Sequence, residues 1–177
     1  MRRTTLVGLI VALALLATSM LTGCGLIAQK ATEAAVEKST GVKVDAQNQT
    51  VTTTDDEGNT TELSAKEGAY PEGFPADFPQ YAGATVASAL KGTTNGEDSF
   101  TVILKTVDAP KDAYEWYLEE FDRAGWTVEQ KMDGTTSDAA FATISVAKGD
   151  LKGAVTLNRG NDETETSIMV GLNPKEK

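Results

Sequence analysis

Histidine is absent from this 177-residue sequence, and cysteine occurs once, at Cys24. Without histidine there can be no His-based catalytic triad, and one cysteine can form neither an internal disulfide nor a Cys/His zinc site. No side chain with an ordinary pKa changes charge between about pH 5 and 8, so a simple pH switch is not expected. We therefore expect no metal and no cofactor.

Carboxylates remain as candidates for catalysis, because glycosidases use two acids that face each other across a cleft. The acidic pairs Asp55-Asp56 and Glu119-Glu120 are instead adjacent in the sequence, as is typical of solvated surface. The nucleophile pattern Gly-x-Ser-x-Gly is also absent. The sequence is therefore interpreted as that of a protein that is not an enzyme.

Positive charge is scarce, and the formal net charge is -10. An acidic surface repels the phosphates of nucleic acids, so nucleic acid is not expected as a partner. Solubility alone also accounts for this acidity.

The first residues have the pattern of an export signal. Arg2 and Arg3 precede an uncharged apolar run, residues 6–16, which is too short to span a membrane. The run is followed by Leu21-Thr22-Gly23-Cys24, which resembles the lipobox of bacterial lipoproteins.

That resemblance implies cleavage of residues 1–23 and a diacylglyceryl group on the sulfur of Cys24. Two acyl chains would hold the chain to the outer side of a membrane far more firmly than one. The alternative is an ordinary secretory signal followed by a buried cysteine.

Residues 24–69 contain no aromatic side chain and cannot build a core alone. We interpret them as a lipid-anchored tether with a short helix in 26–41 and a β-hairpin around the turn 55–59. A flexible chain from Gly25 to Glu67 would reach roughly 36 Å. The oxygen-rich turn also suggests calcium, but its spacing differs from that of an EF-hand loop, which favours a solvated turn.

Aromatic–proline pairs recur every four residues at Tyr70-Pro71, Phe74-Pro75 and Phe78-Pro79. Proline excludes helix here and favours extended or polyproline-like structure. A spacing of four rotates successive rings by about 120° in a polyproline helix, so the rings would not form one stripe. The segment is interpreted as a strap that packs on the neighbouring core; an exposed patch that binds a glycan or a protein is the alternative.

Residues 70–173 are predicted to form an α+β domain, with 174–177 as a tail. Two strands precede a helix at about 110–124, which has Pro110 in its first turn and Gly125 just past its end. Three or four strands follow, so we expect a mostly antiparallel sheet with the helix packed on one face. Trp116 lies at the boundary of the helix's apolar face, where it either covers the core or lines a ligand pocket.

Taken together, the lipobox, the Thr-rich β segment, the Pro-aromatic strap and the helix ending in "AGWTV" resemble a group of bacterial surface lipoproteins with a small C-terminal α+β domain. The resemblance implies a fold and a location, but no catalytic or binding residue. We expect a non-enzymatic accessory module of the cell envelope that binds a protein partner, with Trp116, Phe74 and Phe78 as candidate anchors. The alternative is a binder of a small apolar ligand or glycan.

Overall fold

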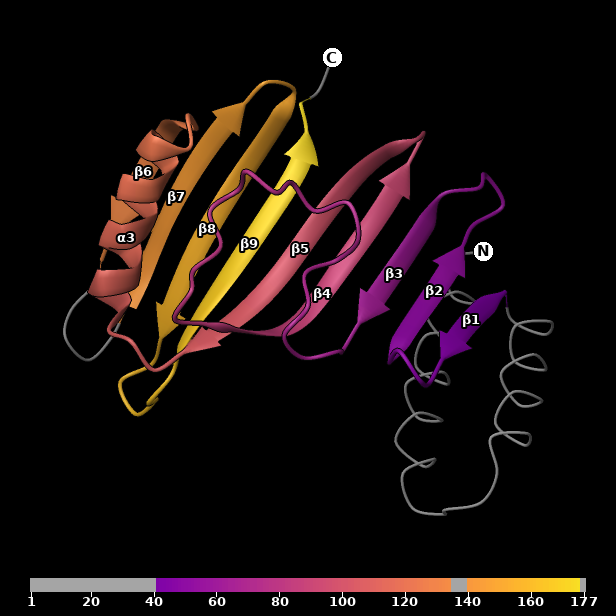
Figure 1. Cartoon of the computed structure of the whole chain (residues 1–177), viewed down its shortest axis with the longest axis horizontal. Coiled ribbons are helices and arrows are strands. Elements are labelled where there is room, and N and C mark those ends of the chain that lie inside the picture. The colour runs from indigo at the N-terminus through magenta and orange to yellow at the C-terminus, as the bar shows by residue number, and fades with distance from the viewer. Residues whose placement is uncertain (1–40, 135–139, 176–177) are drawn as a thin grey trace.

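The computed structural model describes residues 41–134 and 140–175, and it arranges them as one antiparallel sheet with a helix on one face (Figure 1). The predicted signal, Cys24 and the short helix in 26–41 lie outside the described residues, except for Gly41. The described elements are β1 (Val42–Asp45), β2 (Thr50–Thr54), β3 (Thr60–Ser64), β4 (Thr85–Thr94), β5 (Glu97–Thr106), α3 (Pro110–Arg123), β6 (Thr127–Asp133), β7 (Ala140–Lys148), β8 (Leu151–Arg159) and β9 (Thr166–Pro174).

The nine strands are hydrogen-bonded in the order β1-β2-β3-β4-β5-β9-β8-β7-β6, and all their pairings are antiparallel. Helix α3 connects β5, in the middle of the sheet, to β6, at its edge. The chain then returns toward the middle through β7 and β8, so that β9 pairs with β5. The tight turn between β4 and β5 is made by Asn95 and Gly96, both with positive φ, as a two-residue hairpin turn requires. These findings confirm the α+β class and the mostly antiparallel sheet.

Helix α3 forms where the sequence predicts a helix. Pro110 occupies its first turn, and Gly125 follows its end with a φ of 74°, a conformation that costs glycine little. Its buried residues recur at helical spacing and contact β6, β7 and β8; they are Pro110, Ala113, Tyr114, Tyr117 and Phe121. We call the side of the sheet that carries α3 the inner face.

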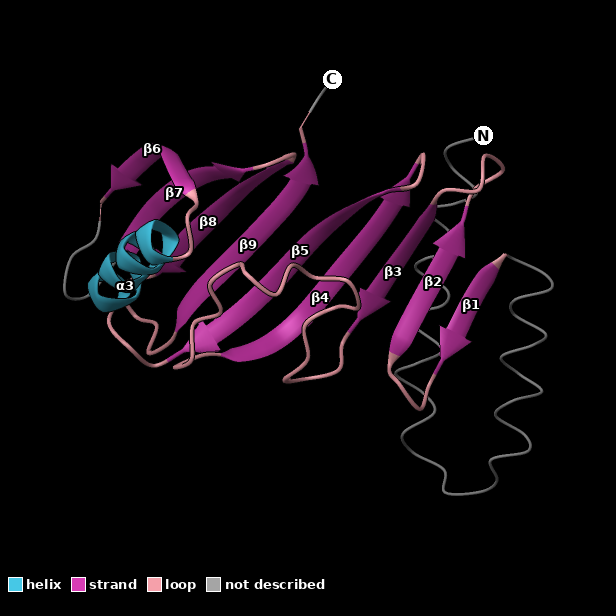
Figure 2. Ribbon diagram, turned by 45° about the horizontal axis from the view of Figure 1, so that its top comes forward, coloured by secondary structure: helices cyan, strands magenta, loops and turns pink. Residues whose placement is uncertain are grey.

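The strap, residues 65–84, crosses the inner face beside α3 (Figures 1 and 2). It is a chain of tight turns: the amide of Phe74 donates to the carbonyl of Pro71, and the amide of Phe78 donates to that of Pro75. The expectation of extended or polyproline-like structure was therefore wrong, because each proline is the first residue of its turn and leaves the two central residues free to bend, as Gly73 does with a φ of 82°. The expectation that the strap is not helical and packs on the core is confirmed.

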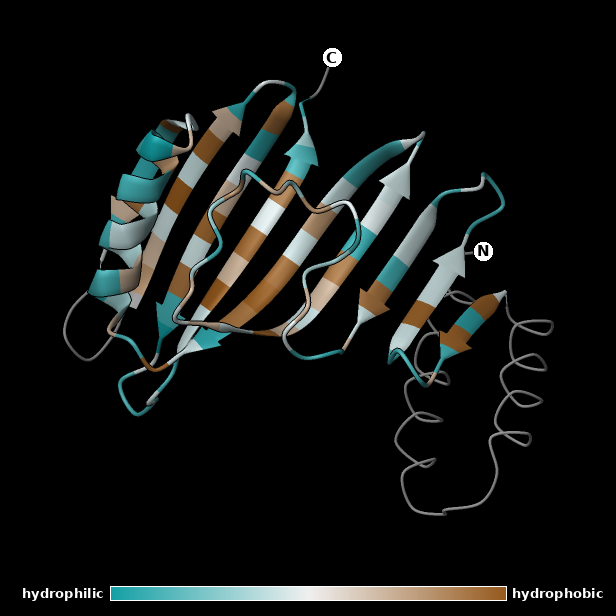
Figure 3. Cartoon of the chain, viewed as in Figure 1, coloured by the Kyte–Doolittle hydropathy of each residue, from teal (hydrophilic) through white to brown (hydrophobic). Residues whose placement is uncertain are grey.

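The core lies between the inner face and the layer formed by α3 and the strap. Alternating residues of β5 point into it, since Phe100, Val102 and Leu104 are buried whereas Ile103, on the opposite face, is partly exposed. Hydrophobic and polar bands alternate in the same way along neighbouring strands (Figure 3). The inner face is therefore covered by the chain itself.

Strands β1 to β4 carry a row of large aliphatic side chains on a different face of the sheet from the core. Register places Val44, Val51, Leu63 and Leu90 directly opposite one another on β1 to β4. Leu90 points away from the core, because its neighbour Ala89 points into it. This aliphatic row therefore lies on the face opposite α3, which we call the outer face.

The expected boundary between the tether, residues 24–69, and the domain lies at residue 70. In the structure β3 pairs with β4, so the sheet continues across that boundary. The predicted turn at 55–59 connects β2 to β3, and β1 adds a third strand beside them. Backbone hydrogen bonding to β4 thus holds these strands in the sheet although they lack aromatic side chains.

Candidate functional site

Phe78, a candidate anchor, is a core residue. Its side chain is 2% exposed, and its ring packs edge-on against the rings of Phe74, Phe121 and Trp126. Gly153 leaves room for it, since a Cβ there would lie 3.3 Å from Cε2 of Phe78. A side chain enclosed in this way cannot serve as a surface anchor, so this prediction is corrected.

Phe74 and Trp116, the other two candidates, lie at the rim of the same core and are partly buried. The ring of Phe74 contacts Phe78 and Phe100, and that of Trp116 contacts Tyr81 and Tyr117. Both residues thus cover the core, which is the packing alternative. The three candidates belong to one aromatic cluster on the inner face rather than to an exposed patch.

Polar contacts tie the strap to the rest of the domain. The hydroxyl of Tyr81 donates to Asp108 at 2.8 Å, and burial and this hydrogen bond raise the pKa of Tyr81 to about 12. Asp77 accepts from Lys148 at 2.6 Å, and its carbonyl accepts from the indole of Trp126 at 3.1 Å. The strap is therefore fastened at two points along its length.

The interior also contains an unpartnered hydroxyl. Tyr117 is fully buried, and its hydroxyl, although near the backbone of Tyr81, has no partner in hydrogen-bonding geometry. Burial raises the pKa of Tyr117 well above its usual range. This is a polar atom on the inner face that the fold itself leaves unsatisfied.

Replacing Tyr117 with phenylalanine is therefore expected to raise the free energy of unfolding by about 1 kcal/mol, because a buried hydroxyl without a partner is costly. The matched change Tyr81→Phe removes the bond to Asp108 and should lower it by about 1 kcal/mol. Urea unfolding followed by tryptophan fluorescence measures both changes. A loss of stability in Tyr117→Phe would show that the hydroxyl has a partner, such as a buried water.

The outer face carries most of the exposed large hydrophobic side chains among the described residues. Their exposed large hydrophobic side chains are Leu90, Val107, Met132, Phe141 and Met169. Register and alternation place all of these except Val107 on the outer face. We call Ile103, Met132, Phe141 and Met169, on β5, β6, β7 and β9, the outer patch.

Strand pairing shows how the members of the outer patch are spaced. Met169 lies directly opposite Ile103, whereas Thr156 and Thr143 lie between Met169 and Met132 across the sheet. Met132, Phe141 and Met169 are 52%, 53% and 46% exposed. This patch was not predicted from the sequence, although period-2 alternation around Ile103 and Met169 was the available signal.

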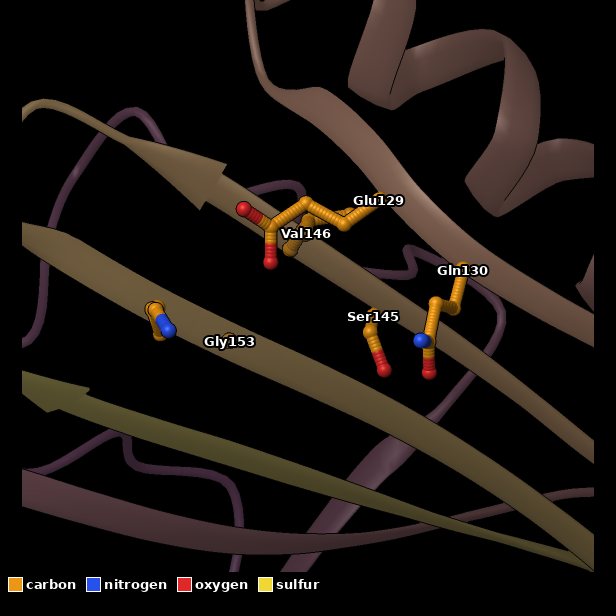
Figure 4. A pocket seen from close by; sticks show the side chains of 6 residues that line it. Glu129, Gln130, Ser145, Val146 and Gly153 are labelled. Carbon is orange, nitrogen blue, oxygen red and sulfur yellow. The ribbon is translucent and has the colours of Figure 1, made fainter. Parts of the chain in front are cut away.

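A shallow hollow of about 640 Å³ borders the outer patch and is lined by Glu129, Gln130, Ser145, Val146, Lys152 and Gly153. Gln130 and Ser145 are directly opposite each other on β6 and β7, and their side chains extend to the same side (Figure 4). The hollow therefore offers amide, hydroxyl and charged groups for hydrogen bonding beside an apolar surface.

Two Ser-x-x-Lys sequences occur in strands, Ser88 to Lys91 and Ser145 to Lys148. A spacing of three in a strand directs the serine and the lysine to opposite faces. Each lysine instead pairs with an aspartate, Lys91 with Asp98 and Lys148 with Asp77. Neither sequence forms a nucleophile with an adjacent base.

In the turn 55–59, the carboxylate of Asp55 accepts hydrogen bonds from the backbone of Glu57 and from the backbone and side chain of Asn59. These bonds, chiefly those from Asn59, lower the pKa of Asp55. They are the contacts of a self-satisfied turn. Within 41–134 and 140–175 no cluster of acidic side chains is arranged to hold a metal ion.

Comparisons with known proteins give one match. Residues 86–167, less than half of the chain, match a family model described as START domain-like. The matched region runs from β4 to the start of β9 and includes α3, but neither β1 to β3 nor the strap. No curated protein and no solved structure matches the chain. In the part of the chain that the structure describes, no helix is both long and apolar enough to cross a membrane.

Proposed function

We propose that this chain is a lipid-anchored, extracytoplasmic binding module without catalytic activity, which docks a protein of the cell envelope through the outer patch. The anchor is Cys24, on the grounds of its lipobox sequence. The observation that carries the docking site is the concentration of exposed Met and Phe side chains on one face of the sheet. A net charge of -10 makes nucleic acid an unsuitable partner.

The composition of this surface favours a protein as the partner. Methionine and aromatic residues are enriched at the centres of protein interfaces, which are usually bordered by polar groups. Here Met132 and Met169 supply exposed apolar side chains on either side of Thr143 and Thr156, and Gln130, Ser145 and Lys152 add polar groups on the same side of the sheet. Among the described residues, the inner face offers no comparable exposed apolar surface, because the strap and α3 cover it.

The test is photo-crosslinking in living cells with the probe at Met169. We expect one envelope protein to be captured from Met169 and none from Val107, which is 75% exposed but lies outside the outer patch. Cys24→Ala should release the chain from the membrane fraction and abolish capture. A Met132→Asp change in the chain that carries the Met169 probe should also abolish capture, because a charge would have to be buried at the interface.

Equal capture from Met169 and Val107 would contradict the docking site. Capture that persists in Cys24→Ala would contradict the role of the anchor. A chain that stays in the membrane fraction without Cys24 would contradict lipidation itself.

A second candidate function is binding of a small apolar ligand between the sheet and the strap. It is favoured by the unpartnered hydroxyl of Tyr117 and by the START domain-like match, which is compatible with a ligand-binding domain. The ligand would have to displace aromatic side chains of the strap. Since Trp126 donates to the strap at Asp77, binding should change the fluorescence of the tryptophans.

The test for this candidate is organic extraction of the purified chain followed by mass spectrometry, with titration of tryptophan fluorescence by the compounds recovered. Tyr117→Phe should weaken binding. Extraction that yields no compound in stoichiometric amount would contradict this function and leave the outer patch as the proposed site.

A further inference from the structure

Methionine has an uneven distribution in this chain. Of the four methionines in the sequence, Met1 and Met20 precede the described residues, and the other two are Met132 and Met169. Both of these lie on the outer face, where they are 52% and 46% exposed. The buried core of the described residues consists of aliphatic and aromatic side chains without sulfur. Within the described part of the chain, thioethers therefore occur on the proposed docking surface and not in the core.

The two methionines make up half of the outer patch, and each is close to one of the other members. Met169 is directly opposite Ile103. Phe141 is two residues along β7 from Thr143, which is opposite Met132, so Phe141 and Met132 are diagonal neighbours on one face. Three strand spacings, about 14 Å, separate β5 from β7. Without apolar methionines, the patch would be reduced to two isolated side chains, Ile103 and Phe141.

Exposed thioethers react with peroxides. The sulfur attacks one oxygen of hydrogen peroxide, the O–O bond breaks, and the products are a sulfoxide and water. The sulfur is oxidised and the peroxide is reduced, so the reaction needs no further reactant. It converts a flexible apolar side chain into a polar one, and reductases specific for methionine sulfoxide reverse it.

The position of the two methionines separates the effect on docking from the effect on folding. Neither side chain belongs to the core cluster of the described residues or packs against it. A sulfoxide at either position therefore keeps its oxygen in water while the domain is unbound. A partner docked on the outer patch would instead have to bury that oxygen, which is costly.

We propose that Met132 and Met169 are sites of reversible oxidation, and that a peroxide which converts them to sulfoxides prevents docking at the outer patch without unfolding the domain. The docking part of this inference rests on the proposed function. The surface is thus sensitive to peroxide, whereas the described core is not, because it contains no sulfur.

The first test needs no partner. Hydrogen peroxide is added to the purified full chain carrying Cys24→Ser, so that no thiol competes, and mass spectrometry of peptides follows each methionine. We expect Met132 and Met169 to form sulfoxide within about threefold of the rate of free methionine, since each is about half exposed. Retention on a hydrophobic-interaction column should fall, and the urea midpoint should stay unchanged.

The control chain also carries Met132→Leu and Met169→Leu, which keep the apolar character and approximate volume but cannot be oxidised. Any change in its retention measures oxidation at Met1 and Met20 alone, and we expect a smaller change than in the parent chain. Oxidation of Met132 and Met169 more than about tenfold slower than that of free methionine would overturn the proposal. Loss of the fold on oxidation, or equal changes in retention of the two chains, would also overturn it.

The second test measures docking. The lipid-anchored chain, with a photo-crosslinking probe at Phe141, is purified in detergent, oxidised, freed of peroxide and returned to cell membranes that lack it. We expect capture of the partner to fall about tenfold or more, because the interface would bury sulfoxide oxygens. Prior treatment of the oxidised chain with reductases for both sulfoxide epimers should restore capture.

The two tests distinguish failure of the oxidation sites from failure of the docking function. Equal capture before and after oxidation would overturn the control of docking by oxidation, although docking itself would stand. Absence of capture from the untreated chain would contradict the proposed docking and its control together. Oxidation rates and column retention do not depend on a partner, so they decide independently whether Met132 and Met169 are the modified residues.

Discussion

Replacing Phe78 with alanine is expected to lower the free energy of unfolding by about 3–5 kcal/mol, the usual cost of removing a buried phenylalanine ring. The ring is enclosed by Phe74, Phe121 and Trp126, and it sits over Gly153. Its removal loses both the transfer free energy of the ring and the contacts around the cavity that remains. Urea unfolding followed by circular dichroism measures the change.

Phe141→Ala is the matched control, because the same side chain is 53% exposed there. It should change the free energy of unfolding by less than about 1 kcal/mol. Similar losses in the two variants would show that Phe141 is covered in solution. A small loss in Phe78→Ala would restore Phe78 as a candidate anchor, because the strap would then be loosely held.

Arg159→Ala is expected to lower the free energy of unfolding by about 3 kcal/mol, because hydrogen bonds to a charged group are among the stronger ones. One nitrogen of Arg159, Nη2, donates to the carbonyls of Val107 at 3.0 Å, Asp108 at 2.9 Å and Thr164 at 3.1 Å. The guanidinium thus joins the end of β8 to the loop before α3 and to the loop before β9. Without it, three carbonyls lose a shared donor.

Arg159→Lys is the informative comparison for this position. Lysine keeps the charge and carries three N–H groups on one nitrogen, but its side chain is one atom shorter than that of arginine and more flexible. We expect it to recover less than about half of the loss, as measured by thermal and urea unfolding. Full recovery by lysine would mean that the positive charge, and not the geometry of the donors, stabilises this corner.

Local patterns in the sequence were sufficient to predict α3 and most of the strands. Pro110 and Gly125 mark the ends of the helix, and alternation at Phe100, Val102 and Leu104 identifies β5 and its buried side. Glu119 and Arg123, four residues apart on the helix, also form an ion pair at 3.0 Å. These features depend on residues at most a few positions apart. Over such distances the side-chain periodicity of a helix or a strand decides which residues share a face.

The candidate site could not be predicted in the same way. Phe74 and Phe78 were candidates because of the regular aromatic–proline spacing, and Trp116 because it lies at the boundary of the helix's apolar face. Their burial depends on how a turn-rich strap crosses a sheet formed mostly by later residues. The outer patch combines side chains from four strands, of which β9 reaches its place beside β5 only through the topology. Side chains so distant in sequence leave no local signal of their proximity.

By itself, the sequence excluded chemistry that needs histidine or a pair of cysteines, and it determined the negative net charge, the α+β class and the helix, since these follow from composition and short-range pattern. The tertiary structure decided that β1 to β3 extend the domain's sheet, that the strap fills the inner face, and that Met132, Phe141 and Met169 gather on the outer face. The physical reason is that alternation along a strand divides its side chains into two faces, but only pairing and packing between strands decide which face is covered.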